Sequence, residues 1–229
     1  MPTINAGKYG ILSAASTSSW SAVRDGTTAN TGTSNQPTSS NGVTAKLTFL
    51  TGGKGSEWSL TRSYFAFDVT AYQTGFNITN LELEIDPTVS TSTNFAFAIV
   101  KSTAQGNANS NLTSGDWDSL DFNTKFAGSS TTYWPDTNSV SQISLNSSAV
   151  AQFSTGYLKI CILSFSDYND DEPFITGTSS ARQNFSYVPR INFTATAAGY
   201  SNNVNGIDGD DIDNIIGVDA ADIDNVSGI

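Results

Sequence analysis

Apolar and polar residues alternate along much of this chain with the period of two that is typical of β-strands. In Leu81-Glu82-Leu83-Glu84-Ile85-Asp86 we expect the leucines and the isoleucine to face a core and the carboxylates to face solvent. In the aromatic run 62–68 we expect Arg62 and Asp68, at its ends, to stay near solvent. Further strands are predicted at 44–50, 95–101, 140–145, 157–165 and 190–196. This pattern predicts an all-β fold, a β-sandwich of the jelly-roll kind.

Two segments depart from the strand pattern. Residues 25–37 are rich in Gly, Thr and Asn and include a proline, so they are too polar to bury and predict a loop. Residues 146–153 place apolar side chains at helical spacing after a possible capping Asn or Ser, which predicts one short helix.

The composition fits one β-rich domain and disfavours several partners. Hydrophobic residues make up 38% of the 229 positions, and charged residues only 14%. Ten basic residues against 21 acidic ones give a formal net charge of −11, so the basic surface that binds nucleic acid is missing, as is the charge that docks to anionic lipid. No segment approaches the roughly 20 apolar residues of a membrane span. We therefore expect neither a nucleic-acid partner nor membrane insertion.

The composition changes at Gly199. From 200 to 229 there are seven aspartates and no Lys or Arg, which leaves a net charge of −4 for residues 1–199. The chain is therefore interpreted as a β-sandwich domain at 1–199 and a separate acidic tail at 200–229. The tail contains an 11-residue repeat, because 206–216 and 217–227 match at eight of eleven positions when Ile and Val are counted as equivalent.

The repeat places branched aliphatic residues at regular intervals. An 11-residue period suits helices in a right-handed bundle, but Gly and Asp weaken helices, so stacked turns or short strands are the alternative. Thirty residues cannot bury these side chains alone, so we expect them to pack against other copies or another protein; a solvated acidic tail is the competing interpretation. The predicted assembly residues are Ile207, Ile212, Ile215, Val218, Ile223, Val226 and Ile229.

Candidate chemistry is sparse. The chain has no histidine, which removes the Ser–His and Cys–His nucleophilic machinery, so we expect no enzymatic activity. A carboxylate pair could cleave sugars, and Glu82 and Glu84 lie roughly 7 Å apart on one strand face. The alternation places both in solvent, however, where neither would act as an acid. Cys161 lies in an apolar strand and is interpreted as a core residue that forms no internal disulfide.

Two clusters are candidate binding sites. Trp117 and the pair Tyr133-Trp134 lie in polar loops, where aromatic rings could stack on a host-surface glycan, although large aromatics more often anchor a core. Asp167, Asp170, Asp171 and Glu172 follow a predicted core strand, and their carboxylates could bind calcium. A solvated acidic loop is the alternative to the calcium site. The aspartates of the tail fit the spacing of calcium loops poorly.

Several motifs, taken in order, resemble a known family. Residues 62–68, 78–83, 100–103, 112–117 and 187–191 are similar to segments of the jelly-roll domains called DNRLRE domains, which are related in shape to carbohydrate-binding modules. The resemblance covers about residues 5 to 196. The tail resembles the Asn-Gly-Val-type repeats that end many structural proteins of tailed phages. The resemblance of these repeats implies a virion protein that is exposed at the phage tail, on a fibre or on the capsid surface.

These observations lead to one expected function and two rivals. We expect a non-enzymatic virion surface protein that binds other virion proteins and copies of itself through its C-terminal segment 200–229. Residues 1–8 lack the basic and apolar regions of a secretory signal, which suits synthesis in the host cytoplasm. The rivals are a stand-alone carbohydrate-binding adhesion module, which needs an aromatic groove, and a polysaccharide-degrading enzyme, which needs two inward-facing carboxylates.

Overall fold

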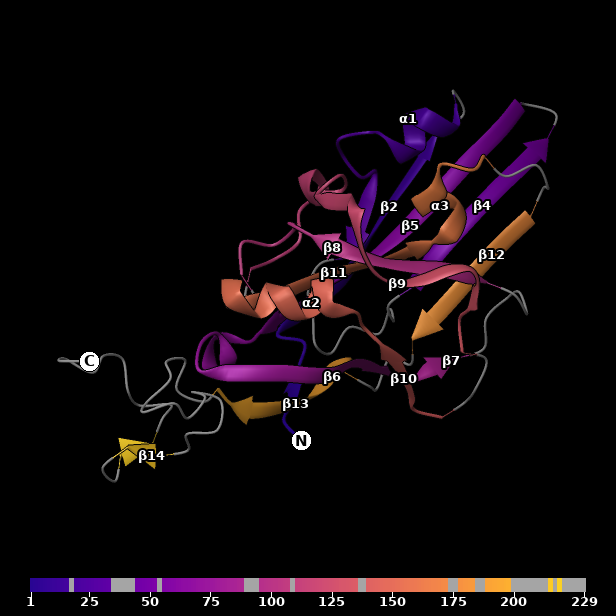
Figure 1. Cartoon of the computed structure of the whole chain (residues 1–229). Helices are drawn as coiled ribbons and strands as arrows, with labels where there is room; N and C mark the ends of the chain where they lie inside the picture. The colour runs from indigo at the N-terminus through magenta and orange to yellow at the C-terminus, as the bar shows by residue number, and fades with distance from the viewer. Residues whose placement is uncertain are drawn as a thin grey trace.

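The computed structural model describes residues 1–16, 19–33, 44–52, 55–88, 95–107, 110–135, 139–172, 177–183, 188–198, 214–215 and 218–219. Within these ranges the body of the protein consists of two antiparallel β-sheets with a few short helical turns (Figure 1). The predicted all-β class is therefore confirmed. All the strands predicted from the alternation are present in these sheets.

The smaller sheet has four strands in the order β1 (Thr3–Asn5), β13 (Arg190–Ala197), β6 (Phe76–Ile85) and β10 (Ser141–Ser144). The strands at the two ends of the body, β1 and β13, are therefore neighbours. The inner side chains of β6 are Leu81, Leu83 and Ile85, all buried, as their alternation with carboxylates predicted. They meet Ile191 and Phe193 of β13 in one core cluster.

The larger sheet contains nine strands. Its main path is β7 (Pro87–Thr88), β12 (Gly177–Gln183), β4 (Thr44–Gly52), β5 (Gly55–Asp68), β11 (Tyr157–Ser164), β8 (Ala96–Ser102) and β9 (Leu120–Tyr133). The long strand β5 pairs with β2 (Lys8–Ser16) along one edge, and β2 in turn pairs with β3 (Thr31–Thr33). On its other edge, β5 pairs first with β4 and then with β11.

Both faces of the central strands of the larger sheet are buried. One face packs against the smaller sheet, with Phe65 of β5 and Ile160 of β11 in the shared core. The opposite face carries Tyr64, Cys161 and other residues of a second cluster, which short helical turns and loops cover. Strands buried on both faces need continuous apolar runs, which explains the sequences of β5, β8 and β11. Cys161 is a buried core residue, as predicted, and its burial raises the pKa of the thiol.

The helical turns include one that the sequence predicted. Asn146 accepts hydrogen bonds from the amides of Ser148 and Ala149 and so caps α2 (Ser147–Val150), which continues into the 3-10 turn η3 (Ala151–Thr155). The other turns are α1 (Trp20–Arg24), η1 (Thr70–Tyr72), η2 (Ser114–Asp116) and α3 (Phe165–Asn169). Within the described ranges, no helix has the length and apolar character needed to cross a bilayer.

The structure corrects the expectations for the segment 25–37 and for Arg62. The segment 25–37, predicted as a loop, has no helix or strand at 25–30, but 31–33 form the strand β3, and 34–37 lie outside the described residues. The pairing of β3 with β2 is a tertiary effect that its polar sequence does not signal. Arg62, expected near solvent, is fully buried. It lies on the face of β5 that the second core cluster covers, and its charge is satisfied there by a partner distant in sequence.

Candidate functional site

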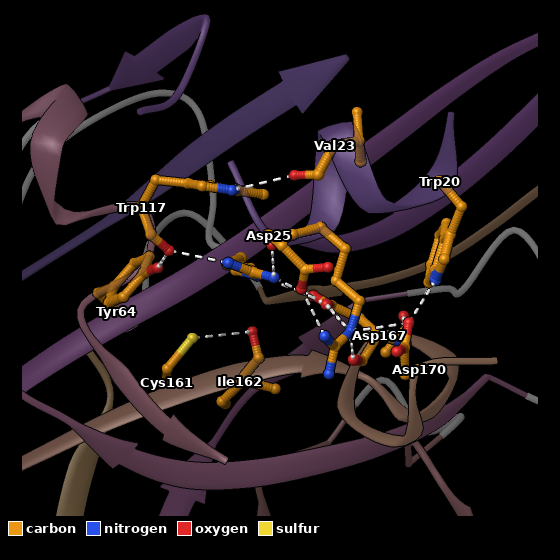
Figure 2. Close-up of polar contacts among 12 residues, drawn as sticks. Trp20, Val23, Asp25, Tyr64, Trp117, Cys161, Ile162, Asp167 and Asp170 are labelled. Carbon is orange, nitrogen blue, oxygen red and sulfur yellow. Dashed lines mark hydrogen bonds and ion pairs between the residues drawn. The ribbon is translucent and has the colours of Figure 1, made fainter. Parts of the chain in front are cut away.

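A buried polar centre lies on the covered face of the larger sheet (Figure 2). The guanidinium of Arg62 donates from Nε and Nη2 to the two carboxylate oxygens of Asp167, both at 2.8 Å. It also donates to the carbonyl oxygens of Trp117 and Arg24, at 2.8 and 2.9 Å. Burial alone would lower the pKa of Arg62, but the adjacent Asp167 carboxylate raises it, and the net shift is upward. Arg62 is therefore charged, paired and inaccessible, which makes this centre a structural one.

The structure does not support the predicted calcium site. Asp167 is buried because α3 turns it inward onto Arg62, so its oxygens are already occupied. Asp170 accepts a hydrogen bond from the Trp20 indole at 2.8 Å, and Asp171 accepts one from Asn169 at 2.7 Å. Among the residues that the structure describes, no three acidic or Cys side chains group in a way that could hold a metal ion. The prediction of a metal site formed jointly by Asp167, Asp170, Asp171 and Glu172 is wrong.

The aromatic residues proposed for glycan stacking are mostly internal. Trp117 is 0% exposed, and its indole donates to the Val23 carbonyl at 3.1 Å (Figure 2). The centre of its ring lies 4.0 Å from Cζ of the Arg62 guanidinium. Trp134 is also buried and packs edge-on against Phe97. The prediction that these two tryptophans bind a ligand is therefore wrong, because neither presents a ring face to solvent. Of the three aromatic residues predicted to bind a glycan, Tyr133 alone is exposed, with 47% of its surface accessible.

The two glutamates of β6 have different environments. Glu82 is half-buried, but Glu84 is buried and forms an ion pair with Arg190 and accepts a hydrogen bond from Asn192. The expectation that Glu84 faces solvent is wrong, because Arg190, which lies opposite it on β13, supplies compensating charge, and Asn192, two residues further along β13, supplies a donor. Since its oxygens are held in this network, Glu84 serves to join β6 to β13.

An open groove runs beside the first half of β6. It consists of two depressions of about 630 and 530 Å³ that share Thr79 and Val150. One wall is β6, and the other is formed by α2 and η3, which lie alongside β6 on the side opposite β13 (Figure 1). The apolar lining residues are Met1, Tyr72, Phe76, Ile78, Leu81, Leu145, Val150, Ala151 and Phe153. Glu82 is the single charged side chain in the lining of these two depressions.

The groove exists because β10 covers only part of the edge of β6. Pairing between the two strands covers 82–85 of β6, and a last bond runs from the Leu145 amide to the Leu81 carbonyl. The chain then turns into α2, and Asn80 adopts a left-handed conformation with φ 51° at a β-bulge opposite β13. Among the described strands, only β13 pairs with residues 76–79 of β6. The opposite edge of this stretch therefore faces the groove.

Backbone alternation shows which groups face that groove. Ala198 donates its amide to the Gly75 carbonyl, and the register pairs Asn77 with Thr196 and Thr79 with Thr194. In an antiparallel ladder, alternate residues bond to the same neighbour, so the odd-numbered residues 75, 77 and 79 bond to β13. The amides and carbonyls of Phe76 and Ile78 therefore point to the groove. Chemically, this site offers main-chain hydrogen bonds above an apolar floor, which suits an extended peptide.

Sequence reasoning missed this site, although a signal was present. The run Phe76-Asn77-Ile78-Thr79 alternates apolar and polar residues and so predicts a longer strand than the one assigned from Leu81 onward. The open edge itself depends on where β10 ends, which the sequence of β6 does not reveal.

The predicted assembly residues are only partly described. Ile215 and Val218 are paired in a short antiparallel ladder between β14 (Asn214–Ile215) and β15 (Val218–Asp219). At Ile215 and Val218 the repeat therefore forms short strands, as one of its two predicted structures has it, and not a helix. The other assembly residues, Ile207, Ile212, Ile223, Val226 and Ile229, lie outside the described residues.

Comparison with known proteins adds no relative to this picture. No protein-family model matches the chain, and no curated protein sequence matches it.

Proposed function

We propose that this chain is a non-enzymatic structural protein of a phage virion. In this proposal the body is a jelly roll exposed on the particle surface, as a tail or fibre component or as a capsid decoration. The C-terminal repeat joins it to copies of itself and to other virion proteins. The observation that carries the assembly role is the repeat, which presents Ile and Val at a regular spacing within a segment that contains seven aspartates and no basic residue.

The size of the tail supports an assembly role. A two-stranded ladder as short as β14 and β15 is at most marginally stable by itself in water. A segment of about 30 residues also falls below the size at which a chain usually builds its own core without disulfides or metals. The chain has one cysteine, which is buried in the body. A neighbouring protein surface would bury the aliphatic side chains of the repeat.

The arrangement of acidic residues supports a non-enzymatic role. Glycoside hydrolysis uses two carboxylates that flank the scissile bond. The buried carboxylates Asp167 and Glu84 are each engaged by an arginine, and Glu82 is the single carboxylate that lines the groove. The chain also lacks histidine, the commonest general base.

The adjacency of β1 and β13 in a two-sheet antiparallel body supports the jelly-roll proposal. The rival glycan-binding module loses its main support with the burial of Trp117 and Trp134, since stacking on a sugar requires an accessible ring face.

Localisation on the particle tests this proposal. Virions purified by density gradient from a lysate are probed with an antibody raised against residues 1–198, followed by gold labelling and electron microscopy. We expect the protein to sediment with intact particles and the label to decorate the tail, a fibre or the capsid without prior disruption. Protein that remains at the top of the gradient, with unlabelled particles, would contradict the proposal. An antibody against an internal capsid component controls for particle integrity.

A further inference from the structure

We propose that the open edge of β6 receives a strand from the C-terminal repeat of a second copy of this chain. The added strand would run antiparallel to β6, bond to Phe76 and Ile78, and cover the groove. This inference rests on the proposed assembly role of the repeat and names the surface that accepts it.

The edge has the features of an acceptor. Residues 76–80 of β6 are Phe, Asn, Ile, Thr and Asn, so this stretch carries neither the charges nor the proline with which proteins usually block an exposed strand edge. Phe76 and Ile78 each direct one backbone N–H donor and one carbonyl acceptor toward the groove. An extended peptide with the matching spacing can therefore continue the ladder of the smaller sheet.

The floor of the groove supplies apolar contacts beside this edge. Phe76 is 41% exposed, one of few large apolar side chains so exposed among the described residues, and its ring packs edge-on against Tyr72. Ile78 and Val150 are half-buried at the margin of the main core and line the same depression as Phe153. A strand laid between β6 and η3 would place every second side chain over these residues and remove them from water.

The repeat has a sequence that fits such a strand. Asp211-Ile212-Asp213 and Asp222-Ile223-Asp224 each set one Ile between two aspartates. In an extended conformation the Ile faces one side and both aspartates face the other. The Ile would contact the apolar floor, while the carboxylates would lie on the solvent face of the sheet. The ladder formed by β14 and β15 shows that the repeat adopts extended structure between these two units.

Chain direction favours a second copy as the donor. β13 delivers the chain to Ala198, which bonds to Gly75 at the Phe76 end of β6, on the edge opposite the groove. A tail that entered the groove of its own body directly from that end would run parallel to β6. Parallel strands pair slightly less stably per residue than antiparallel ones, whereas the tail of another copy can enter antiparallel.

A pair of substitutions in the full-length chain tests the edge. Ile78→Pro removes the amide that faces the groove, while Ile78→Ala removes most of the same side chain and keeps the amide. Self-association is measured by analytical ultracentrifugation over a range of concentrations. We expect association of Ile78→Pro to be about tenfold weaker than that of Ile78→Ala, which corresponds to the loss of about one hydrogen bond. Far-UV circular dichroism checks that both variants are folded.

Hydrogen exchange in the unmodified protein gives a second readout that does not depend on folding of the proline variant. The amides of Phe76 and Ile78 should be protected in the associated protein and exchange rapidly on dilution to monomer. The Asn77 amide, which bonds to β13, should be protected in both states and serves as the internal control.

The outcomes separate this inference from the proposed function. If the chain associates through its tail but the Phe76 and Ile78 amides exchange equally fast in both states, the repeat docks elsewhere and this inference is wrong. Equal association of folded Ile78→Pro and Ile78→Ala would lead to the same conclusion. A full-length chain that never associates would overturn both the inference and the assembly role.

Discussion

Asp167→Asn should lower the free energy of unfolding by about 3–5 kcal/mol, the usual cost of leaving one member of a buried ion pair without its partner. The substitution preserves the size of the side chain but removes the charge, and its amide group places a donor against the donors of Arg62. Both side chains are essentially inaccessible, so water cannot replace the lost interaction. Denaturation with urea, followed by circular dichroism, measures the change.

A matched control lies four residues further along the chain. Asp171 is exposed, and Asp171→Asn should change stability by less than about 0.5 kcal/mol. Replacing both partners by apolar residues, as in Arg62→Met with Asp167→Leu, should recover part of the loss, since no charge is then left unpaired in the core. Equal stabilities of Asp167→Asn and Asp171→Asn would show that the buried pair does not hold α3 against β5.

Trp117→Ala should also destabilise the protein strongly, by about 3–5 kcal/mol. The substitution leaves a cavity in the second core cluster, removes the hydrogen bond to the Val23 carbonyl and takes the aromatic face away from Arg62. Tyr133→Ala is the control, since the sequence suggested the same ligand role for both residues but Tyr133 is exposed. We expect that control to cost less than about 0.5 kcal/mol, measured by thermal and urea unfolding with circular dichroism. A stable Trp117→Ala variant would contradict the structural role assigned to this tryptophan.

The successes of sequence reasoning follow from local periodicity. Leu81, Leu83 and Ile85 alternate with polar residues, and the pleat of one strand is enough to place them in the core. The cap at Asn146 is also local, because its side chain bonds to amides two and three residues away. The buried Cys161 could be predicted because its neighbours are apolar on both sides.

The errors arise where contacts join segments distant in sequence. The position of Arg62 at the end of an aromatic run predicts exposure, but its partner Asp167 lies 105 residues away and holds it in the core. Trp117 is surrounded by polar neighbours, and the carbonyl that binds its indole belongs to Val23, 94 residues earlier. The groove beside Ile78 depends on where β10 stops pairing, which is a property of topology. Local patterns therefore predicted the strands but not the surfaces formed where strands and turns meet.

The molecular mass in solution tests most directly whether the C-terminal repeat holds copies of this protein together. Multi-angle light scattering is applied to the full-length chain, to residues 1–198 and to a full-length Ile212→Asp, Ile223→Asp variant, which keeps the whole body and tail. We predict that the full-length protein associates in a concentration-dependent manner, whereas the truncated and substituted proteins are monomeric with unchanged circular dichroism spectra. A full-length protein that is monomeric at every concentration, or a truncated protein that associates equally well, would contradict the claim.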